Sequence, residues 1–145
     1  SLLADYNRLK EIGIPIGGIG PRPFNRGEGK PYIGAVKKGK LILPKITEVG
    51  EIISSASLIP IPHFKQVGGM ESSLFIDGVD HEWCWRAKKI GGWRFFISES
   101  VQLSHQVGEG DRPFIFRKVA IPTPFRTFYQ FRNYLLFFSL YIVDF

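Results

Sequence analysis

Glycine and proline divide the apolar part of this chain into short runs, and each run has either helical or β-strand spacing. The clearest helix is predicted at residues 79–90. Apolar residues recur there at helical spacing: Val79, Trp83, Ala87 and Ile90. The Gly91-Gly92 pair can end this helix. Residues 2–11 show a similar pattern, which Gly13 can end.

Several other runs have the composition of strands, so the chain as a whole is predicted to be α/β. They comprise residues 14–19, 46–61, 93–97 and 101–105. Gly20-Pro21 is expected to close the first run. Residues 21–45 are rich in Pro, Gly and Lys, which predicts a loop region with short strands at Tyr32–Val36 and Leu41–Leu43. Residues 62–67 predict one helical turn, and residues 106–113 predict a loop.

A last helix is predicted from Thr123-Pro124, with Thr as the N-cap and Pro at the first helical position. Its apolar residues form one stripe: Phe128, Phe131, Leu135, Phe138 and Ile142. The longest apolar stretch, residues 134–143, has about ten residues, roughly half of what a membrane span needs.

The order of these elements is not a regular βαβ series, which is natural for part of a larger domain. The 145 residues suit one domain or a large piece of one. Cys84 is the single cysteine, so no intrachain disulfide can form and a reducing compartment is expected.

The net charge is +6, and an acidic middle lies between two basic ends. Basic flanks favour phosphates of a nucleotide, a nucleic acid or an anionic lipid. An acidic centre is where a general base or metal ligands could sit. The alternative is ordinary solvated charge, which explains most such residues.

Two carboxylates, Asp77 and Asp80, stand where a loop is predicted to enter the helix at residues 79–90. A carboxylate is favoured at a helix N-terminus, and a sugar-transfer base must be a carboxylate that accepts a proton from an acceptor hydroxyl. The alternative is structural, because the two acids are spaced like a variant of the capping box.

Residues 75–86, FIDGVDHEWCWR, resemble a stretch of family two glycosyltransferases. That stretch has an aromatic-rich strand end, a Glu-Asp pair and a helix that carries an Arg. Asp80 matches the Asp of the pair, which is the catalytic base of the family, whereas Val79 replaces the Glu. This replacement is typical of the rhamnosyltransferase branch, which reads Phe-Ile-Asp-x-Val-Asp-x-Glu-Trp.

Other segments resemble family elements in the same order, from about residue 1 to about residue 138. They are the Gly-Pro element (Ile19-Gly20-Pro21), the Ser/Gly-rich strand (Ile53–Ile59), the Val-Gly turn (Val67–Met70), the histidine strand (Leu103-Ser104-His105) and a Tyr-Tyr-x-x-Arg-Asn helix start (Phe128–Asn133).

The resemblance implies the C-terminal, acceptor-side part of a glycosyltransferase A-type fold, which is a Rossmann-like α/β arrangement. It implies inverting transfer of a deoxysugar, rhamnose from a dTDP-sugar, to a glycan acceptor in the synthesis of cell-surface polysaccharide. The family's N-terminal half binds the nucleotide and ends in an Asp-x-Asp motif, which holds divalent Mg²⁺ or Mn²⁺. No Asp-x-Asp occurs here, so we expect no nucleotide-binding residues in this segment and no activity from it alone.

The resemblance also suggests roles for residues around Asp80. Acceptor contacts are assigned to Trp83, Glu82, Asp77 and Gly69, and His105 is a candidate metal ligand. Three of them have a structural alternative: Trp83 lies on the apolar helix stripe, Glu82 and Arg86 are spaced to pair, and a lone His such as His105 at a strand end is often only packed. Cys84 is not expected to be a nucleophile, and the glycines at 17–20 do not have phosphate-loop spacing.

Residues 1–111 are therefore assigned to the acceptor-side part, and residues 112–145 to a basic, aromatic C-terminal segment with a helix. Basic and aromatic residues alternate in this segment, which suits an anionic membrane surface. Members of the family often act on lipid-linked acceptors, which implies a cytoplasmic protein that contacts the inner membrane. The alternatives are a helix docked on its own domain, or on a second copy in a homodimer.

A different class of function stays open, namely a non-catalytic basic module that binds a membrane or nucleic acid. Its support is the +6 charge and the alternation of basic and aromatic residues. It leaves the acidic centre unexplained, and no nucleic-acid-binding motif appears, so nucleic acid is not an expected partner.

Overall fold

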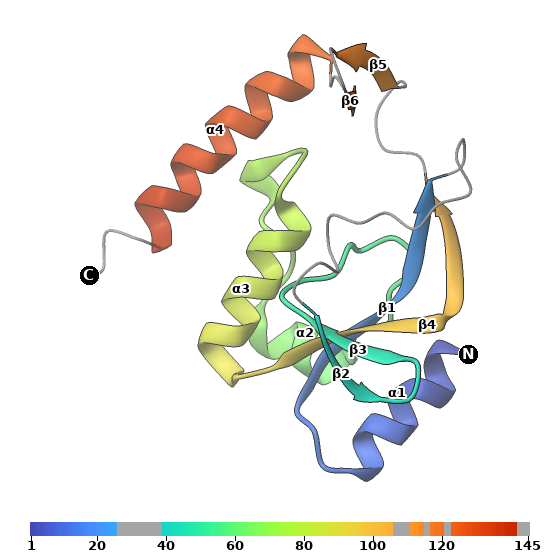
Figure 1. The fold of residues 1–145 in the computed structure, drawn as a ribbon. Helices are drawn as coiled ribbons and strands as arrows, with labels where there is room; N and C mark the ends of the chain where they lie inside the picture. Colours follow the sequence, from blue (N-terminus) through green and yellow to red (C-terminus); the bar gives the residue numbers. More distant parts are fainter. Residues whose placement is uncertain (26–38, 106–110, 115–116, 121–122, 142–145) are drawn as a thin grey trace.

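The computed structural model describes residues 1–25, 39–105, 111–114, 117–120 and 123–141 (Figure 1). Its elements in chain order are α1 (Leu2–Glu11), β1 (Ile16–Asn25), β2 (Lys40–Leu43), β3 (Ile46–Val49), α2 (Ile61–Val67), the 3-10 helix η1 (Ser72–Leu74), α3 (Val79–Gly91), β4 (Arg94–His105), β5 (Asp111–Phe114), β6 (Arg117–Ala120) and α4 (Pro124–Tyr141). The predicted α/β class is confirmed.

Four strands form one mixed sheet in the order β1-β4-β3-β2. β1 and β4 are parallel, whereas β3 runs antiparallel to both β4 and β2. β5 and β6 form a separate antiparallel pair. The mixed sheet followed by a C-terminal helix is compatible with part of a glycosyltransferase fold.

Helices cover both faces of the mixed sheet, because side chains of β4 alternate between two apolar cores. Phe95 and Ile97 pack with Trp83 and Ala87 of α3 on one face. Phe96 packs with Leu9 of α1 on the other face. α4 lies beside α3 on the side away from the sheet (Figure 1). The face that carries α2 and α3 therefore positions the two candidate carboxylates.

Gly17 and Gly18 lie in β1, in agreement with the prediction of a strand rather than a phosphate loop. Both glycines allow close packing of neighbouring side chains against the strand. A Cβ added at Gly17 would lie 2.8 Å from the Phe95 ring, and one at Gly18 would lie 2.8 Å from Ile52. Real Cβ atoms do not approach other atoms so closely. Small residues are therefore needed here to seat the sheet against its neighbours.

Both long strands continue past their predicted ends. β1 does not stop at Gly20-Pro21 and instead runs to Asn25. A proline is tolerated there because β1 is the edge strand of the mixed sheet, next to β4, and the register shifts between Pro21 and Arg22. β4 is one strand where two were predicted, because its pairing with β1 resumes after that shift.

The other strand predictions are only partly confirmed. Of the run at 46–61, residues 46–49 form β3 and Leu58 makes an isolated bridge to Ile19. β2 confirms the predicted strand at Leu41–Leu43. The predicted strand at Tyr32–Val36 lies outside the described residues, as do residues 106–110 of the predicted loop. Residues 111–113 belong to β5 instead of that loop.

The helix predictions are confirmed, including their ends. Gly68 follows α2, and Gly92 in the left-handed conformation follows α3. The Thr123 hydroxyl accepts a hydrogen bond from the Arg126 backbone N–H at 3.4 Å, as an N-cap does. The apolar stripe of α4 is not buried on its own domain, however. Phe128, Phe131 and Leu135 are exposed, and the side chains of Phe138 and Ile142 lie outside the described residues.

Candidate functional site

The N-terminus of α3 is not capped by either candidate carboxylate. Gly78 is the N-cap residue, in the left-handed conformation with φ +84°, and no side chain makes the capping hydrogen bond. The capping-box interpretation of Asp77 and Asp80 is therefore wrong. Both carboxylates are directed to other parts of the chain.

Asp80 lies in the first turn of α3 and is partly exposed. Its Oδ2 accepts a hydrogen bond from the Ser54 backbone N–H at 3.1 Å. Ser54 belongs to the segment between β3 and α2, which two backbone hydrogen bonds between Leu58 and Ile19 join to β1. Within the described part of the chain, Asp80 Oδ1 accepts no hydrogen bond. That oxygen is therefore available to accept a proton.

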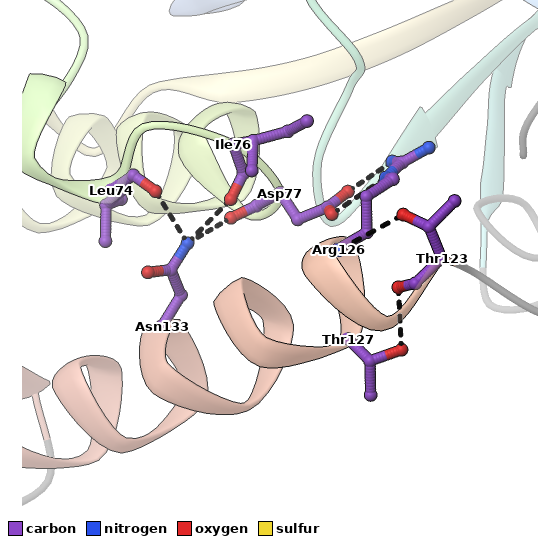
Figure 2. A network of polar contacts seen from close by, with 7 residues as sticks. All are labelled: Leu74, Ile76, Asp77, Thr123, Arg126, Thr127 and Asn133. Carbon is purple, nitrogen blue, oxygen red and sulfur yellow. Dashed lines mark hydrogen bonds and ion pairs between the residues drawn. The ribbon is translucent and has the colours of Figure 1, made fainter.

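Asp77 is tied to the C-terminal helix. Its carboxylate accepts two hydrogen bonds from the Arg126 guanidinium, one of them from Nε at 3.0 Å (Figure 2). The Asp77 side chain is 17% exposed and its backbone φ is +63°. This bidentate pair accounts for the position of Asp77 without any contact to an acceptor.

Trp83 and Glu82 are buried, which corrects the prediction that they contact an acceptor. Trp83 is fully buried in the core, and its indole N–H donates to the Gly68 carbonyl at 2.9 Å. Glu82 is 3% exposed and accepts two hydrogen bonds from Arg86, at 2.7 and 2.8 Å. The predicted pair of Glu82 and Arg86 thus forms, but with its carboxylate inside the protein. A sugar could reach neither side chain.

Arg86 also holds the turn after α2, where the remaining predicted acceptor contact lies. Its guanidinium donates to the carbonyls of Val67 and Gly69, both at 2.8 Å. Gly69 is exposed, and a Cβ added there would meet nothing within 4 Å. The prediction that Gly69 contacts an acceptor stays a prediction.

A cavity of about 320 Å³ lies between α3 and α4, next to the turn that carries Asp80. It is lined by Glu51, Asp77, Gly78, His81, Trp85, Gln130, Asn133, Tyr134 and Phe137. Trp85 and Tyr134 are 39% and 64% exposed, so aromatic rings stand beside carboxylate, imidazole and amide groups. Such a mixture suits a ligand with both apolar faces and hydroxyl groups.

His81 and Glu51 form an ion pair in this cavity, with 2.9 Å between Nδ1 and Oε1. The Glu51 carboxylate raises the pKa of His81 against the opposing effect of burial. The contact with His81 in turn lowers the pKa of Glu51, which also accepts a hydrogen bond from the Trp85 indole at 3.1 Å. This pair was not predicted from the sequence, because Glu51 and His81 are far apart in the chain and no local pattern connects them.

The Cys84 thiol and the His63 imidazole are both held within the fold. Cys84 is buried, and burial raises the pKa of its thiol to about 12, which disfavours the thiolate that a nucleophile needs. The His63 ring contacts the Ile16 carbonyl at 2.8 Å and stacks on Trp93.

Among the described residues, no three His, Cys, Asp or Glu side chains are grouped so that they could hold a metal ion. The described donor set therefore does not fit a divalent metal. The side chain of His105, the predicted ligand, lies outside the description, although its backbone ends β4 opposite Asn25.

The chain is similar to the dTDP-rhamnosyl transferase RfbF of Shigella flexneri. The two are 33% identical over 84 residues, which are 58% of this chain and 28% of the relative. The chain thus matches less than a third of that protein's length. No protein-family model and no solved structure matches the chain. The similarity supports a glycosyltransferase role.

Proposed function

We propose that this chain is the acceptor-side part of an inverting glycosyltransferase and that Asp80 is its catalytic base. The observation that carries the proposal is the setting of Asp80, which is partly exposed at a helix N-terminus with one carboxylate oxygen oriented by Ser54 and the other unoccupied. A base in direct contact with the reacting hydroxyl needs this geometry.

The proposed reaction is a single displacement. The acceptor O–H gives its proton to the Asp80 carboxylate while its oxygen attacks the anomeric carbon of the donor sugar. The bond from that carbon to the diphosphate oxygen breaks, the nucleoside diphosphate leaves with the electron pair, and the configuration inverts. The name of the similar protein suggests a dTDP-rhamnose donor.

The acceptor-binding part of the proposal moves from Trp83 and Glu82 to the cavity between α3 and α4. Asp80 does not line this cavity, whereas His81 and Gly78 on either side of it do. We therefore place a sugar unit of a glycan acceptor against Trp85 and Tyr134, next to the reacting hydroxyl. Apolar sugar faces can pack on such rings while hydroxyl groups bond the polar lining.

Metal and location are further parts of the proposal. Mg²⁺ or Mn²⁺ would supply charge for the departing diphosphate, held by residues of the complete protein other than those described here. A cytoplasmic protein in contact with an anionic membrane surface is supported by the exposed aromatic face of α4 and by a tail with no acidic residue from 112 to 143. No helix in the described part of the chain combines the length and hydrophobicity of a membrane span.

The base assignment is tested by Asp80→Asn in the complete protein, with dTDP-rhamnose and the natural glycan acceptor. The amide keeps the shape but cannot accept the proton, so we expect kcat to fall about 10²–10⁴-fold. Glu11→Gln, at the exposed end of α1, removes one carboxylate elsewhere and should leave kcat unchanged. Turnover of Asp80→Asn within a few-fold of the wild type would show that Asp80 is not the base.

The acceptor site is tested by Trp85→Ala, assayed at varied acceptor concentration. We expect KM for the acceptor to rise about tenfold, equivalent to about 1.4 kcal/mol of binding, with a smaller change in kcat. Ile90→Ala removes an exposed apolar side chain from the same helix and is the matched control. An unchanged KM in Trp85→Ala would place the acceptor elsewhere.

A further inference from the structure

We propose that α4 holds the backbone of residues 74–78 and thereby positions Asp80, and that Arg126 and Asn133 are the positioning residues. The inference rests on the proposed role of Asp80. It concerns the segment of residues 74–78, which immediately precedes α3 and connects the turn of Asp80 to the rest of the protein.

Two residues of this segment that carry a Cβ, Phe75 and Asp77, have a backbone conformation that they do not favour, whereas Gly78 adopts its positive φ readily. Phe75, Asp77 and Gly78 have φ values of +60°, +63° and +84°. The left-handed region costs a residue with a Cβ roughly 1–2 kcal/mol, and a bulky side chain such as Phe is rare there. Local preference therefore does not hold this shape, and contacts from outside the segment must do so.

Asn133 of α4 supplies the central contacts. The residue is 1% exposed, and the two N–H groups of its amide are shared among three backbone carbonyls: Leu74 at 3.0 Å, Ile76 at 2.8 Å and Asp77 at 2.7 Å from the nitrogen (Figure 2). Its Oδ1 accepts from the Arg132 guanidinium at 2.9 Å, and so the amide is held in the orientation that points its N–H groups at the segment.

Other residues of α4 contact the same segment and the preceding Ser73 along about three helical turns. Arg126 forms the bidentate pair with Asp77, and Arg132 donates to the Ser73 carbonyl at 2.5 Å. Gly78 lies so close to Phe137 that a Cβ would come within 2.9 Å of the ring. One face of α4 is thus fitted to a strained turn, while its aromatic face stays exposed.

The contacts from α4 can affect Asp80 because residues 74–78 continue directly into α3. The Gly78 carbonyl accepts the first hydrogen bond of that helix, from the Glu82 N–H at 2.9 Å. A change of backbone at Asp77 and Gly78 would rotate the first turn and move the Asp80 carboxylate away from the Ser54 N–H. A misplacement of about 1 Å can cost about 100-fold in rate.

The positioning role of α4 is tested by Arg126→Gln in the complete protein. We expect hydrogen exchange of the amides at 74–80 to accelerate, and kcat to fall at least tenfold with KM for the acceptor within a few-fold of the wild type. Arg126→Lys keeps a charge near Asp77 and should restore part of kcat. Arg8→Gln breaks the Arg8–Asp5 pair of α1, which is 3.2 Å long, and is the matched control with unchanged exchange at 74–80.

A double variant separates positioning from general stability. If Arg126 acts through Asp80, adding Arg126→Gln to Asp80→Asn should cost no further turnover. Asn133→Ser, with a shorter side chain that reaches fewer carbonyls, should give the same pattern. The inference is overturned if exchange at 74–80 is unchanged, or if the losses of the two single variants multiply in full. An Asp80→Asn variant with normal turnover would overturn the proposed function instead, whatever the exchange data show.

Discussion

At the residue scale, neighbouring carboxylates that the sequence does not distinguish have different environments in the structure, and these environments indicate which of them have structural roles. Asp77, Asp80 and Glu82 lie within six positions of one another. Asp77 is paired with Arg126, Glu82 is buried with Arg86, and Asp80 keeps an accessible oxygen. This difference supports the proposed role of Asp80, because bidentate guanidinium contacts already occupy the carboxylates of Asp77 and Glu82.

The ion pair of His81 and Glu51 predicts a pH dependence of stability. The pKa of His81 is raised above 6.5, so its contribution is complete below that value and is lost as pH rises through the raised pKa. The pKa of Glu51 is lowered below 4.5, so its contribution is complete above that value and is lost as pH falls through the lowered pKa. The pair should therefore stabilise the folded protein most between pH 4.5 and 6.5.

Urea unfolding of the wild type and His81→Gln would measure this effect. The difference in unfolding free energy should be larger at about pH 5.5 than at about pH 8.5, since the wild type loses the charged imidazole at the higher pH. Glu51→Gln should show the same trend because it removes the partner. An equal difference at both pH values would mean that the imidazole carries no charge in the folded protein.

At the element scale, α3 depends on glycines at both of its ends. Gly78 begins it and Gly92 ends it, both in the left-handed conformation. Between them, Trp83 and Ala87 pack on the sheet while His81 and Trp85 face the cavity. The helix therefore joins core and site through its 3.6-residue period.

Gly92→Ala tests the helix end. A Cβ there would meet nothing within 4 Å, so only the left-handed backbone opposes it, and we expect a loss of about 1–2 kcal/mol in unfolding free energy. Gly69→Ala also enters open space, but without a left-handed φ, and should cost no more than about 0.5 kcal/mol. Both losses can be measured by thermal or urea unfolding. Equal losses for Gly92→Ala and Gly69→Ala would show that the left-handed conformation of Gly92 is not the cause of the destabilisation.

At the scale of the whole molecule, α4 has two faces with different partners. Asn133 and Arg126 hold the turn before α3, whereas an aromatic and aliphatic face remains uncovered. That face comprises Phe125, Phe128, Phe131, Tyr134 and Leu135, each more than half exposed. An exposed patch of this kind beside a basic tail suits an anionic membrane surface.

Flotation with vesicles that contain anionic lipid tests this contact. We expect the combined Phe128→Ser and Phe131→Ser substitutions to reduce the fraction of complete protein that floats, because they remove exposed apolar area that a membrane would bury. Leu3→Ser with Ile12→Ser changes two exposed apolar positions, one on α1 and one directly after it, and should leave flotation unchanged. If the variants instead change only the molecular mass in solution, the face joins two copies of the chain.

The sequence by itself determined the helices, their glycine and proline ends, the α/β class and the segment that carries the candidate base. These features depend on local spacing and on backbone preferences, both of which are set by residues close together in the chain. The tertiary structure decided the length of β1 and β4, because pairing between strands over 70 positions apart overrode the prolines. It also decided that Trp83 and Glu82 are buried, that Glu51 meets His81, and that Asn133 holds the turn before Asp80. Each of these depends on contacts between segments distant in the chain, and no local pattern records such contacts.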